Sequence, residues 1–252
     1  MAAAPRLLNL SVYAPALEGD DRRPLAIVHG MERALPDLRL RWTLSEKEEL
    51  IALPHRDEWV ATHRADGGFP FLCNDDESRP VTLTGWENPS GLAAGGPPRF
   101  EVHATLPQDP GGLTAAGAVL EAIGEGARAV WGQLSPSGYG EVVSQQFRRP
   151  GDAPHVSPHG LPWLKLPRYN PAPELPHYLG WLNYWSDASA RAIGFPDPAR
   201  DAELLSRARR TETGGWVVQL TDAPLDFDNP THLDALLRAY GRFPKIGGRS
   251  AT

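Results

Sequence analysis

Proline and glycine punctuate the whole chain, occurring 26 and 25 times in 252 residues. A proline inside a helix removes a hydrogen bond and clashes with the preceding turn, and a glycine there weakens the helix. The chain can therefore form only helices and strands of modest length, separated by many turns. Because 41% of the residues are hydrophobic, these short elements can still bury a core large enough to fold without disulfides or metals.

The balance of charges is acidic, with a formal net charge of −6. This balance argues against non-specific nucleic-acid binding, which depends on clustered Lys and Arg, and it suits a basic protein partner. Cys73 is the only cysteine, so no internal disulfide can form. No apolar run is long enough to span a bilayer, and the first residues do not form a convincing signal peptide. We therefore expect a cytoplasmic protein that does not contact a membrane.

The first half of the sequence alternates short apolar strands with three helical patterns. In residues 100–106, apolar residues alternate with Glu101, His103 and Thr105, which is the clearest strand pattern in the chain. The helical patterns cover residues 25–35, 57–63 and about 113–132. Further strands are predicted at residues 7–14, 38–43, 49–53, 69–73 and 81–86.

Residues 136–176 contain nine prolines and predict an irregular connector that crosses the surface. Beyond it, strands are predicted at residues 179–185 and 216–220, and helices at 187–193, at 202–208 and after residue 229. We therefore divide the chain into an N-terminal half (residues 1–134), a Pro-rich connector (135–176) and a C-terminal half (177–252), and we expect these parts to pack as one compact unit.

The order of these elements predicts an α+β fold, with a mostly antiparallel or mixed sheet and helices packed on it. The sequence has no regular strand-helix-strand period and no glycine-rich dinucleotide-binding motif, which disfavours a doubly wound parallel sheet. In both halves an alternating strand passes through a loop with Pro and Asp into a helix, in FEVHATLPQDPGGL and in WVVQLTDAPLDFDNPTHL. This similarity suggests a weak pseudo-repeat.

The segment LDFDNPTHLDALLRAY combines two aspartates with a helix boundary. Asn229 precedes Pro230, and proline suits the first helical position while it pushes the residue before it out of the helical conformation. Asn229 is therefore predicted to be the N-cap. Asp226 and Asp228 then lie near the positive end of the helix dipole, which explains them without a ligand. A divalent-cation site at these two carboxylates remains the alternative.

Two tryptophans lie four residues apart in the predicted strand at 179–185. Trp181 and Trp185 should share one face of this strand, while Leu182 and Tyr184 point to the other. Gly180 allows a neighbouring element to approach closely. We therefore expect both indoles to be largely buried.

Few residues suggest catalysis or metal binding. Cys73 ends the apolar run FPFLC, and a buried small residue is more typical of such a position than a nucleophilic thiolate. Asp75, Asp76 and Glu77 follow directly, and adjacent carboxylates in a loop form a solvated turn more often than a cation site.

His155 and His159 have a zinc-like spacing, but no cysteine or glutamate motif accompanies them. Serine-nucleophile and phosphate-loop motifs are missing as well. The sequence therefore predicts no assembled catalytic or metal site and no cofactor. A metal-dependent hydrolase that uses Asp and His residues is the alternative to a binding protein.

The C-terminal third contains a Gly-Trp strand in LGWLNYWS, a second strand reached through glycine in GGWVVQL, and DFDNPTH before the last helix. With these features it resembles the immunity protein 52 family. The structural signature residues are Gly180, Trp181, Trp185, Trp216, Asn229 and Pro230. The whole chain, with segments such as LIALPHRDEW and LCNDDESRPVTLTGWENP, also resembles a myxobacterial family of unknown function, number 5953.

The first resemblance implies a protein of a bacterial polymorphic-toxin system that binds a cognate toxin domain, often one of restriction-endonuclease fold, and blocks it. The second resemblance implies no activity. A nuclease must present basic residues to phosphate, so charge can steer an acidic inhibitor to it. The candidate partner-binding residues are Asp75, Asp76, Glu77, Trp86, Glu87, Tyr139, Asp226 and Asp228. Among them, Trp86 and Tyr139 are expected to be exposed aromatic anchors.

Overall fold

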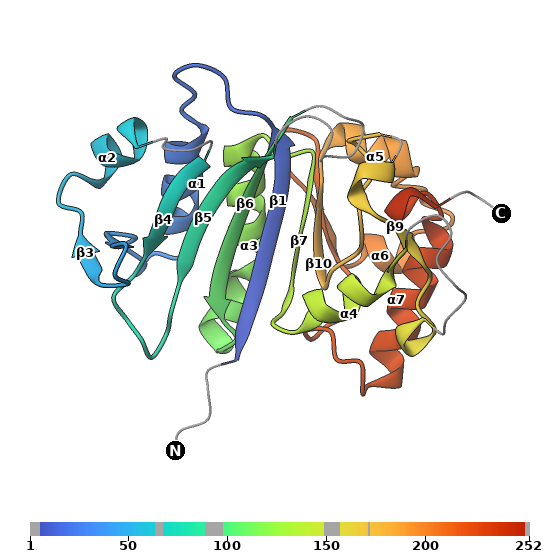
Figure 1. Cartoon of the computed structure of the whole chain (residues 1–252). Coiled ribbons are helices and arrows are strands. Elements are labelled where there is room, and N and C mark those ends of the chain that lie inside the picture. Colours follow the sequence, from blue (N-terminus) through green and yellow to red (C-terminus); the bar gives the residue numbers. More distant parts are fainter. Residues whose placement is uncertain (1–5, 64–67, 89–97, 149–156, 171, 250–252) are drawn as a thin grey trace.

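A computed structural model describes residues 6–63, 68–88, 98–148, 157–170 and 172–249. Within these ranges the chain forms a ten-stranded sheet with the strand order β11-β12-β10-β7-β1-β6-β5-β4-β2-β3. Every pairing in this sheet is antiparallel. Figure 1 shows helices packed on the sheet, and the predicted α+β class is confirmed.

The N-terminal part of the chain supplies the middle and one edge of the sheet. Its strands are β1 (Leu7–Pro15), β2 (Trp42–Leu44), β3 (Leu50–Ala52), β4 (Gly68–Cys73), β5 (Thr82–Asn88) and β6 (Arg99–Pro107). Its helices are α1 (Arg23–Ala34), α2 (Arg56–Thr62) and α3 (Pro110–Ala127). The predicted strand at 38–43 is wrong in its first half, because the Leu40 N–H donates to the Glu32 carboxylate (2.9 Å) instead of to a strand.

The rest of the chain completes the sheet and adds helices around it. Its strands are β7 (Trp131–Pro136), β8 (Phe147–Arg148), β9 (Leu164–Lys165), β10 (Leu182–Trp185), β11 (Ala208–Arg210) and β12 (Trp216–Gln219). Its helices are α4 (Tyr139–Gln146), α5 (Asp187–Ile193), α6 (Ala202–Leu205) and α7 (Pro230–Arg242), with short 3-10 turns at Pro158–Gly160, Pro167–Tyr169 and Ile246–Gly248. No helix in the described ranges is both long and apolar enough to cross a membrane.

Strand β7 was not predicted, although it joins the two halves by pairing with β1 and with β10. The helix predicted to reach residue 132 ends at Ala127, because Arg128 adopts a left-handed conformation (φ 52°) and its N–H caps the helix. The buried strand that follows has apolar residues on both faces, so it lacks the alternation that marks a strand. Helix α4, inside the predicted connector, and β11, at the end of a predicted helix, were missed as well.

Helices α1 and α3 cover one face of the sheet, behind the strands in Figure 1. Glycines of α3 permit close packing, since a Cβ added to Gly126 would lie 2.9 Å from the Ile27 backbone nitrogen and one added to Gly124 would lie 2.9 Å from the Tyr184 ring. The apolar residues of β1 and β6 are buried beneath these helices. This layer forms the larger part of the core.

Among the described residues, the opposite face of the sheet is covered at the β10 and β12 end. There the Trp185 ring contacts Phe195 and Phe243, with ring centroids 5.1 and 5.3 Å apart. Trp181 and Trp185 are 4% and 0% exposed, so their predicted burial is confirmed. Tyr184, on the other face of β10, is also buried. The sheet therefore has helices on both faces at this end.

The two predicted strand-loop-helix passages share the same helix start. Asp109 and Asn229 are the N-caps of α3 and α7, and a proline follows each cap. The Asn229 carbonyl oxygen accepts a hydrogen bond from the Thr231 N–H (3.0 Å), so the predicted N-cap is confirmed. The two helices nevertheless pack on opposite faces of the sheet, because α3 lies against Tyr184 and the end of α7 against Trp185.

Replacing Asn229 by alanine should destabilise the protein by about 0.5–2 kcal/mol, because the Thr231 N–H loses its acceptor. Asn229→Asp keeps an acceptor oxygen and should change the free energy of unfolding by less than about 0.5 kcal/mol. Urea unfolding of both variants measures the difference. Equal stability of Asn229→Ala and the unaltered protein would contradict the assigned role of this cap.

Candidate functional site

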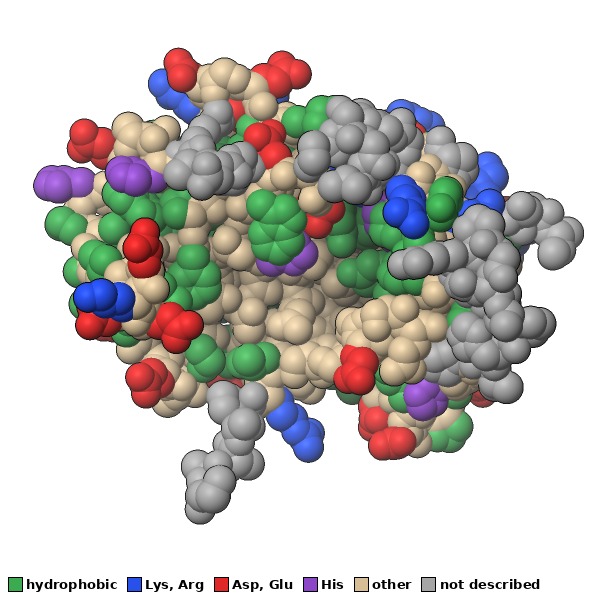
Figure 2. Space-filling model, in the orientation of Figure 1, with side chains coloured by type: hydrophobic (Ala, Val, Ile, Leu, Met, Phe, Trp, Pro, Cys, Tyr) green, Lys and Arg blue, Asp and Glu red, His purple; other side chains and the backbone are tan. Residues whose placement is uncertain are grey.

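The face of the sheet opposite α1 and α3 carries no described helix over β1, β5 and β6. Because side chains alternate along a strand, every second residue of these strands points to this open face. They include Asn9, Ser11, Tyr13, Thr82, Thr84, Trp86, Asn88, Arg99, Glu101, His103 and Thr105. Figure 2 shows the open face as a hollow whose floor is formed by backbone and uncharged side chains, with acidic side chains at its lower margins on both sides.

Trp86 is held over this open face by His103. Their rings stack with centroids 4.1 Å apart and planes inclined by 8°. Ser11 Oγ lies 2.9 Å from His103 Nδ1, and Glu101 Oε2 lies 3.6 Å from His103 Nε2. Trp86 remains 42% exposed, so its predicted exposure is confirmed. The stacked imidazole supports one side of the indole, so the exposed ring has a fixed orientation.

Ser11, His103 and Glu101 follow the order of a nucleophile, a base and a carboxylate. Acyl transfer also needs donors that are free to bind an oxyanion. Ser11 lies in the middle of β1, which is paired with β6 on one side and β7 on the other, so the backbone N–H groups beside it belong to the sheet. The distance from Glu101 to His103 also exceeds a hydrogen bond. This geometry suits the positioning of Trp86 better than it suits catalysis.

The end of the open face next to β7 is closed by buried aromatic residues. The rings of Tyr13 and Trp131 stack with centroids 4.1 Å apart, and the His177 ring lies 4.8 Å from that of Trp131. Arg99 Nη1 donates to His177 Nε2 (3.1 Å). Burial, and then the charge of Arg99, holds the pKa of His177 well below its ordinary value. His177 is therefore a neutral, structural histidine.

The acidic loop between β4 and β5 gives its three carboxylates different roles. Asp76 Oδ1 accepts hydrogen bonds from the Ser78 N–H (2.9 Å) and hydroxyl (2.5 Å), and the hydroxyl bond is the main cause of the lowered pKa of Asp76. Asp75 and Glu77 are exposed and make no hydrogen bond or ion pair with another described residue. Asp76 therefore shapes the loop, whereas the Asp75 and Glu77 side chains face solvent.

The two aspartates before α7 also have different roles, one in the loop and one facing solvent. Asp226 Oδ1 accepts a hydrogen bond from the Asp228 N–H (2.9 Å), and the Asp226 N–H donates to His232 Nδ1 (3.2 Å). The Asp228 carboxylate is exposed, with no partner among the described residues. The loop is thus organised as a helix start. Across the described ranges, no group of three or more His, Cys, Asp or Glu residues is placed to hold a metal ion.

Two other candidate residues are tied into the structure. Tyr139 is only 4% exposed, so its predicted exposure is wrong. Its hydroxyl donates to the Leu179 carbonyl and its ring stacks on Phe227, because α4 turns this residue toward the core. Glu87 is half-buried and accepts a hydrogen bond from the Leu17 N–H (2.7 Å). Both side chains thus make contacts within the fold.

The remaining candidates for chemistry do not form a site. Cys73 is 6% exposed, and burial, followed by the charge of Asp75, raises the pKa of its thiol. His159 is exposed and stacks on Phe227, while His155 lies outside the described residues. The buried thiol agrees with the predicted structural role of Cys73.

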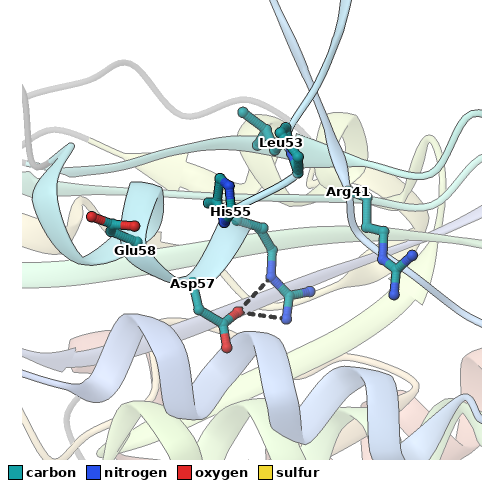
Figure 3. A pocket seen from close by; sticks show the side chains of 7 residues that line it. Arg41, Leu53, His55, Asp57 and Glu58 are labelled. Atoms are coloured by element: carbon teal, nitrogen blue, oxygen red, sulfur yellow. Dashed lines mark hydrogen bonds and ion pairs between the residues drawn. The ribbon is translucent and has the colours of Figure 1, made fainter.

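A shallow pocket of about 430 Å³ lies at the start of α2 and is lined by Arg41, Leu53, Pro54, His55, Arg56, Asp57 and Glu58. Asp57 is held by Arg56, as Figure 3 shows, and also lies 2.8 Å from His29 Nε2. Burial raises the pKa of Asp57, but the hydrogen bonds from Arg56 and His29 outweigh it, so the pKa is lowered. In Figure 3 Arg41 and Glu58 lie apart and point in different directions. These groups join α2 to α1 and do not converge on a substrate.

Sequence reasoning missed Ser11, Glu101 and His103 as parts of one cluster. The alternation in residues 100–106 did place Glu101 and His103 on one face of a strand. It gave no signal that β1 and β5 would lie on either side of β6. The cluster depends on this pairing, which joins residues far apart in the sequence.

Comparison with known proteins places the chain in a family and a fold. Residues 19–251 match the family described as "Domain of unknown function (DUF5953)", as the whole-chain resemblance predicted. A search of curated proteins gave no match. Among solved structures, the chain is similar to "Pseudomonas aeruginosa T6SS protein PA0821", with a TM-score of 0.53 and 16% identity over 94% of this chain and 76% of that one. At this identity the likeness concerns the fold alone. The resemblance to the immunity protein 52 family stays a prediction.

Acidification should destabilise the protein through His177. The unfolded chain binds a proton at this histidine below about pH 6.5, whereas the folded chain does not, because the pKa of buried His177 is lowered. Neutral His177 therefore imposes no cost on folding above about pH 6.5. As the pH falls below this value, the free energy of unfolding decreases by up to about 1.4 kcal/mol per pH unit. Urea unfolding between about pH 5 and pH 8 measures the slope.

The variant His177→Asn should flatten this slope relative to that of the unaltered protein. The slopes of stability against pH are compared, not the absolute stabilities, since His177→Asn also alters the contact with Arg99. Identical slopes for the two proteins would refute the assignment.

Proposed function

The chain belongs to the family described as "Domain of unknown function (DUF5953)", and we propose that it is an immunity protein that binds a cognate bacterial toxin domain and blocks it stoichiometrically. The observation that carries this proposal is the arrangement of the open face. It combines an oriented, exposed indole over a mostly uncharged hollow, in which Glu101 lies beside His103, with free carboxylates on the loops at the lower end of the sheet. Such a surface suits recognition of a basic protein.

The acidic side chains support the first step of binding. Asp75, Glu77 and Asp228 are exposed and free of described partners. Their loops lie at the same end of the sheet, on either side of the N-terminus in Figure 1. A nuclease toxin presents basic residues to phosphate, so these carboxylates would steer it and compete for its active surface. Trp86 would then supply the buried contact that slows dissociation.

The resemblance to the immunity protein 52 family supports the same function. Its signature residues build the C-terminal end of the fold, where a Cβ added to Gly180 would lie 2.6 Å from Gln133 Oε1 and the Trp185 ring is buried. The fold shared with a protein named as a T6SS protein is compatible with a role connected to such a system. We place the complex in the cytoplasm and expect no cofactor and no direct contact with nucleic acid. A nuclease of restriction-endonuclease fold is the toxin class that this resemblance suggests.

A metal-dependent hydrolase is the alternative function, and it has less support. The described residues contain no group of three metal-ligating side chains. The Ser11, His103 and Glu101 cluster lacks free oxyanion donors, as argued above. No geometric feature of the described residues favours the hydrolase over a binding protein.

The direct test is to express the toxin domain encoded beside this gene with and without this chain. We expect growth to be restored only when the chain is present, and the two proteins to co-purify in a fixed ratio. An inactivated toxin serves as the control for expression load. Equal killing in both cultures by an active toxin would refute the proposal for that pair, as would turnover by this chain alone.

Reversing the free carboxylates should slow association. The triple variant Asp75→Lys, Glu77→Lys and Asp228→Lys should lower the association rate constant by about tenfold or more at low salt, with little change in dissociation. The control variant Glu18→Lys, Asp20→Lys and Glu212→Lys changes the net charge equally through other exposed residues. Stopped-flow or surface-plasmon measurements compare the two, and equal rate constants would exclude steering by these loops.

Removing the Trp86 indole should speed dissociation of the complex. Trp86→Ala should raise the dissociation rate constant by about tenfold or more, because an aromatic side chain buried at the centre of an interface contributes at least about 1.4 kcal/mol. Tyr169→Ala is the matched control, since Tyr169 is also 42% exposed. Similar dissociation rates for the two variants would place the interface away from Trp86.

A further inference from the structure

The two edges of the ten-stranded sheet differ in chemistry. Edge strand β11 carries the exposed residues Arg209 and Arg210. Edge strand β3 instead carries Leu50 and Ile51, each 46% exposed, followed by the exposed Ala52. Charged side chains on an edge discourage pairing with another chain, whereas an apolar edge permits it. Strand β3 is therefore the edge that is open to an added strand.

The backbone of β3 has unused hydrogen-bonding groups. The Leu53 N–H donates to the Arg41 carbonyl (2.7 Å), and the Glu49 carbonyl accepts at the other end of the β2–β3 pair (2.9 Å). In an antiparallel pair, residues that bond to the neighbouring strand alternate with residues that face outward. Leu50 and Ala52 thus direct their N–H and C=O groups away from β2, where no described residue bonds to them.

Apolar surface flanks this edge on both faces of the sheet. Leu44 pairs directly with Leu50 on one face, and both are more than two-fifths exposed. Ile51 points to the other face and lines a groove of about 770 Å³, which is also bordered by Leu53, Trp59, His63, Phe69, Pro70 and Trp86. An added strand would place alternate side chains on these two surfaces, which is how strand addition obtains specificity.

The turn before β3 is acidic. It contains the exposed residues Glu46, Glu48 and Glu49, with Lys47 as the one cation of residues 45–49. The other end of β3 is mixed in charge, because Arg41 and Arg56 lie there beside Asp57 and Glu58. A second copy of the chain would bring the same acidic turn to the interface. A basic segment would meet opposite charge instead.

We propose that β3 is a docking edge for an extended segment of a partner protein in which apolar residues alternate with Lys or Arg. The segment adds to the sheet as an eleventh strand, bonding to Leu50 and Ala52 and packing apolar side chains beside Ile51. This inference goes beyond the proposed function, because it requires no toxin and rests on the backbone of β3, although Trp86 borders both the open face and the groove beside Ile51.

The test uses the full chain and an acetylated, amidated peptide of alternating lysine and valine, about seven residues long. Binding is measured by calorimetry, and amide hydrogen exchange is followed by NMR. We expect saturable binding and exchange at the Leu50 and Ala52 amides that slows by about tenfold or more with peptide. A glutamate-valine peptide of the same length should bind at least about tenfold more weakly.

Two variants at one position isolate the backbone contribution. Ala52→Pro removes the outward N–H without disturbing the bonds to β2 and should weaken peptide binding by about tenfold or more. Ala52→Val keeps the N–H and should bind within about twofold of the unaltered chain. Circular dichroism confirms that both fold.

Three results would overturn the proposal. They are no binding at about millimolar peptide, binding that leaves the Leu50 and Ala52 amides unprotected, and equal affinity of Ala52→Pro and Ala52→Val. Light scattering measures the oligomeric state as a fourth readout. A dimer that Ala52→Pro converts to a monomer would show that a second copy occupies the edge, which also overturns the proposal.

Discussion

The pairing of β1 with β6 fixes the rest of the structure. The two strands run antiparallel over nine paired positions, from Leu7 opposite Pro107 to Pro15 opposite Arg99. Because side chains alternate with a period of two, this register places the apolar residues of both strands on one face and the polar residues on the other. A slip of one residue would invert both faces. Helices α1 and α3 can therefore cover only the apolar face, and the opposite face must tolerate water or a partner.

The C-terminal end of the sheet is packed differently, with side chains buried on both of its faces. Strand β10 is buried on both faces, since Tyr184 packs against α3 and Trp185 packs against Phe195 and Phe243. The sheet therefore changes from three layers at β10 and β12 to two layers at β5 and β6. The open face lies where the third layer stops, and the stacked rings of Tyr13 and Trp131 seal the boundary. The hollow is thus a consequence of unequal layering.

Much of the fold could be predicted because most elements carry a local signal. Alternation identified β6, and the Asn229-Pro230 sequence identified the start of α7 through capping. Strand β7 could not be found this way, because it is buried on both faces, lacks a regular alternation of apolar and polar residues, and follows a helix whose spacing runs on into it. The cluster under Trp86 was unpredictable for another reason: it needs Ser11 and His103, which are distant in sequence and meet only by pairing. Tyr139 falls in the segment that was predicted to be an irregular surface connector, whereas α4 turns it inward.

The geometry decides which of the acidic side chains are bonded within the fold and which face solvent. Asp76, Glu87 and Asp226 accept backbone hydrogen bonds and would be needed in a protein of any function. Carboxylates of this kind make the net charge more negative but do not face a partner. The net charge alone therefore overestimates the number of acidic side chains that a partner can contact. Asp75, Glu77 and Asp228 differ because their neighbours already hold the turns and leave them facing water. A loop whose shape is fixed by one carboxylate can present the next at little entropic cost on binding. Pairing a structural acid with a free one is therefore how these loops can be both ordered and available for recognition.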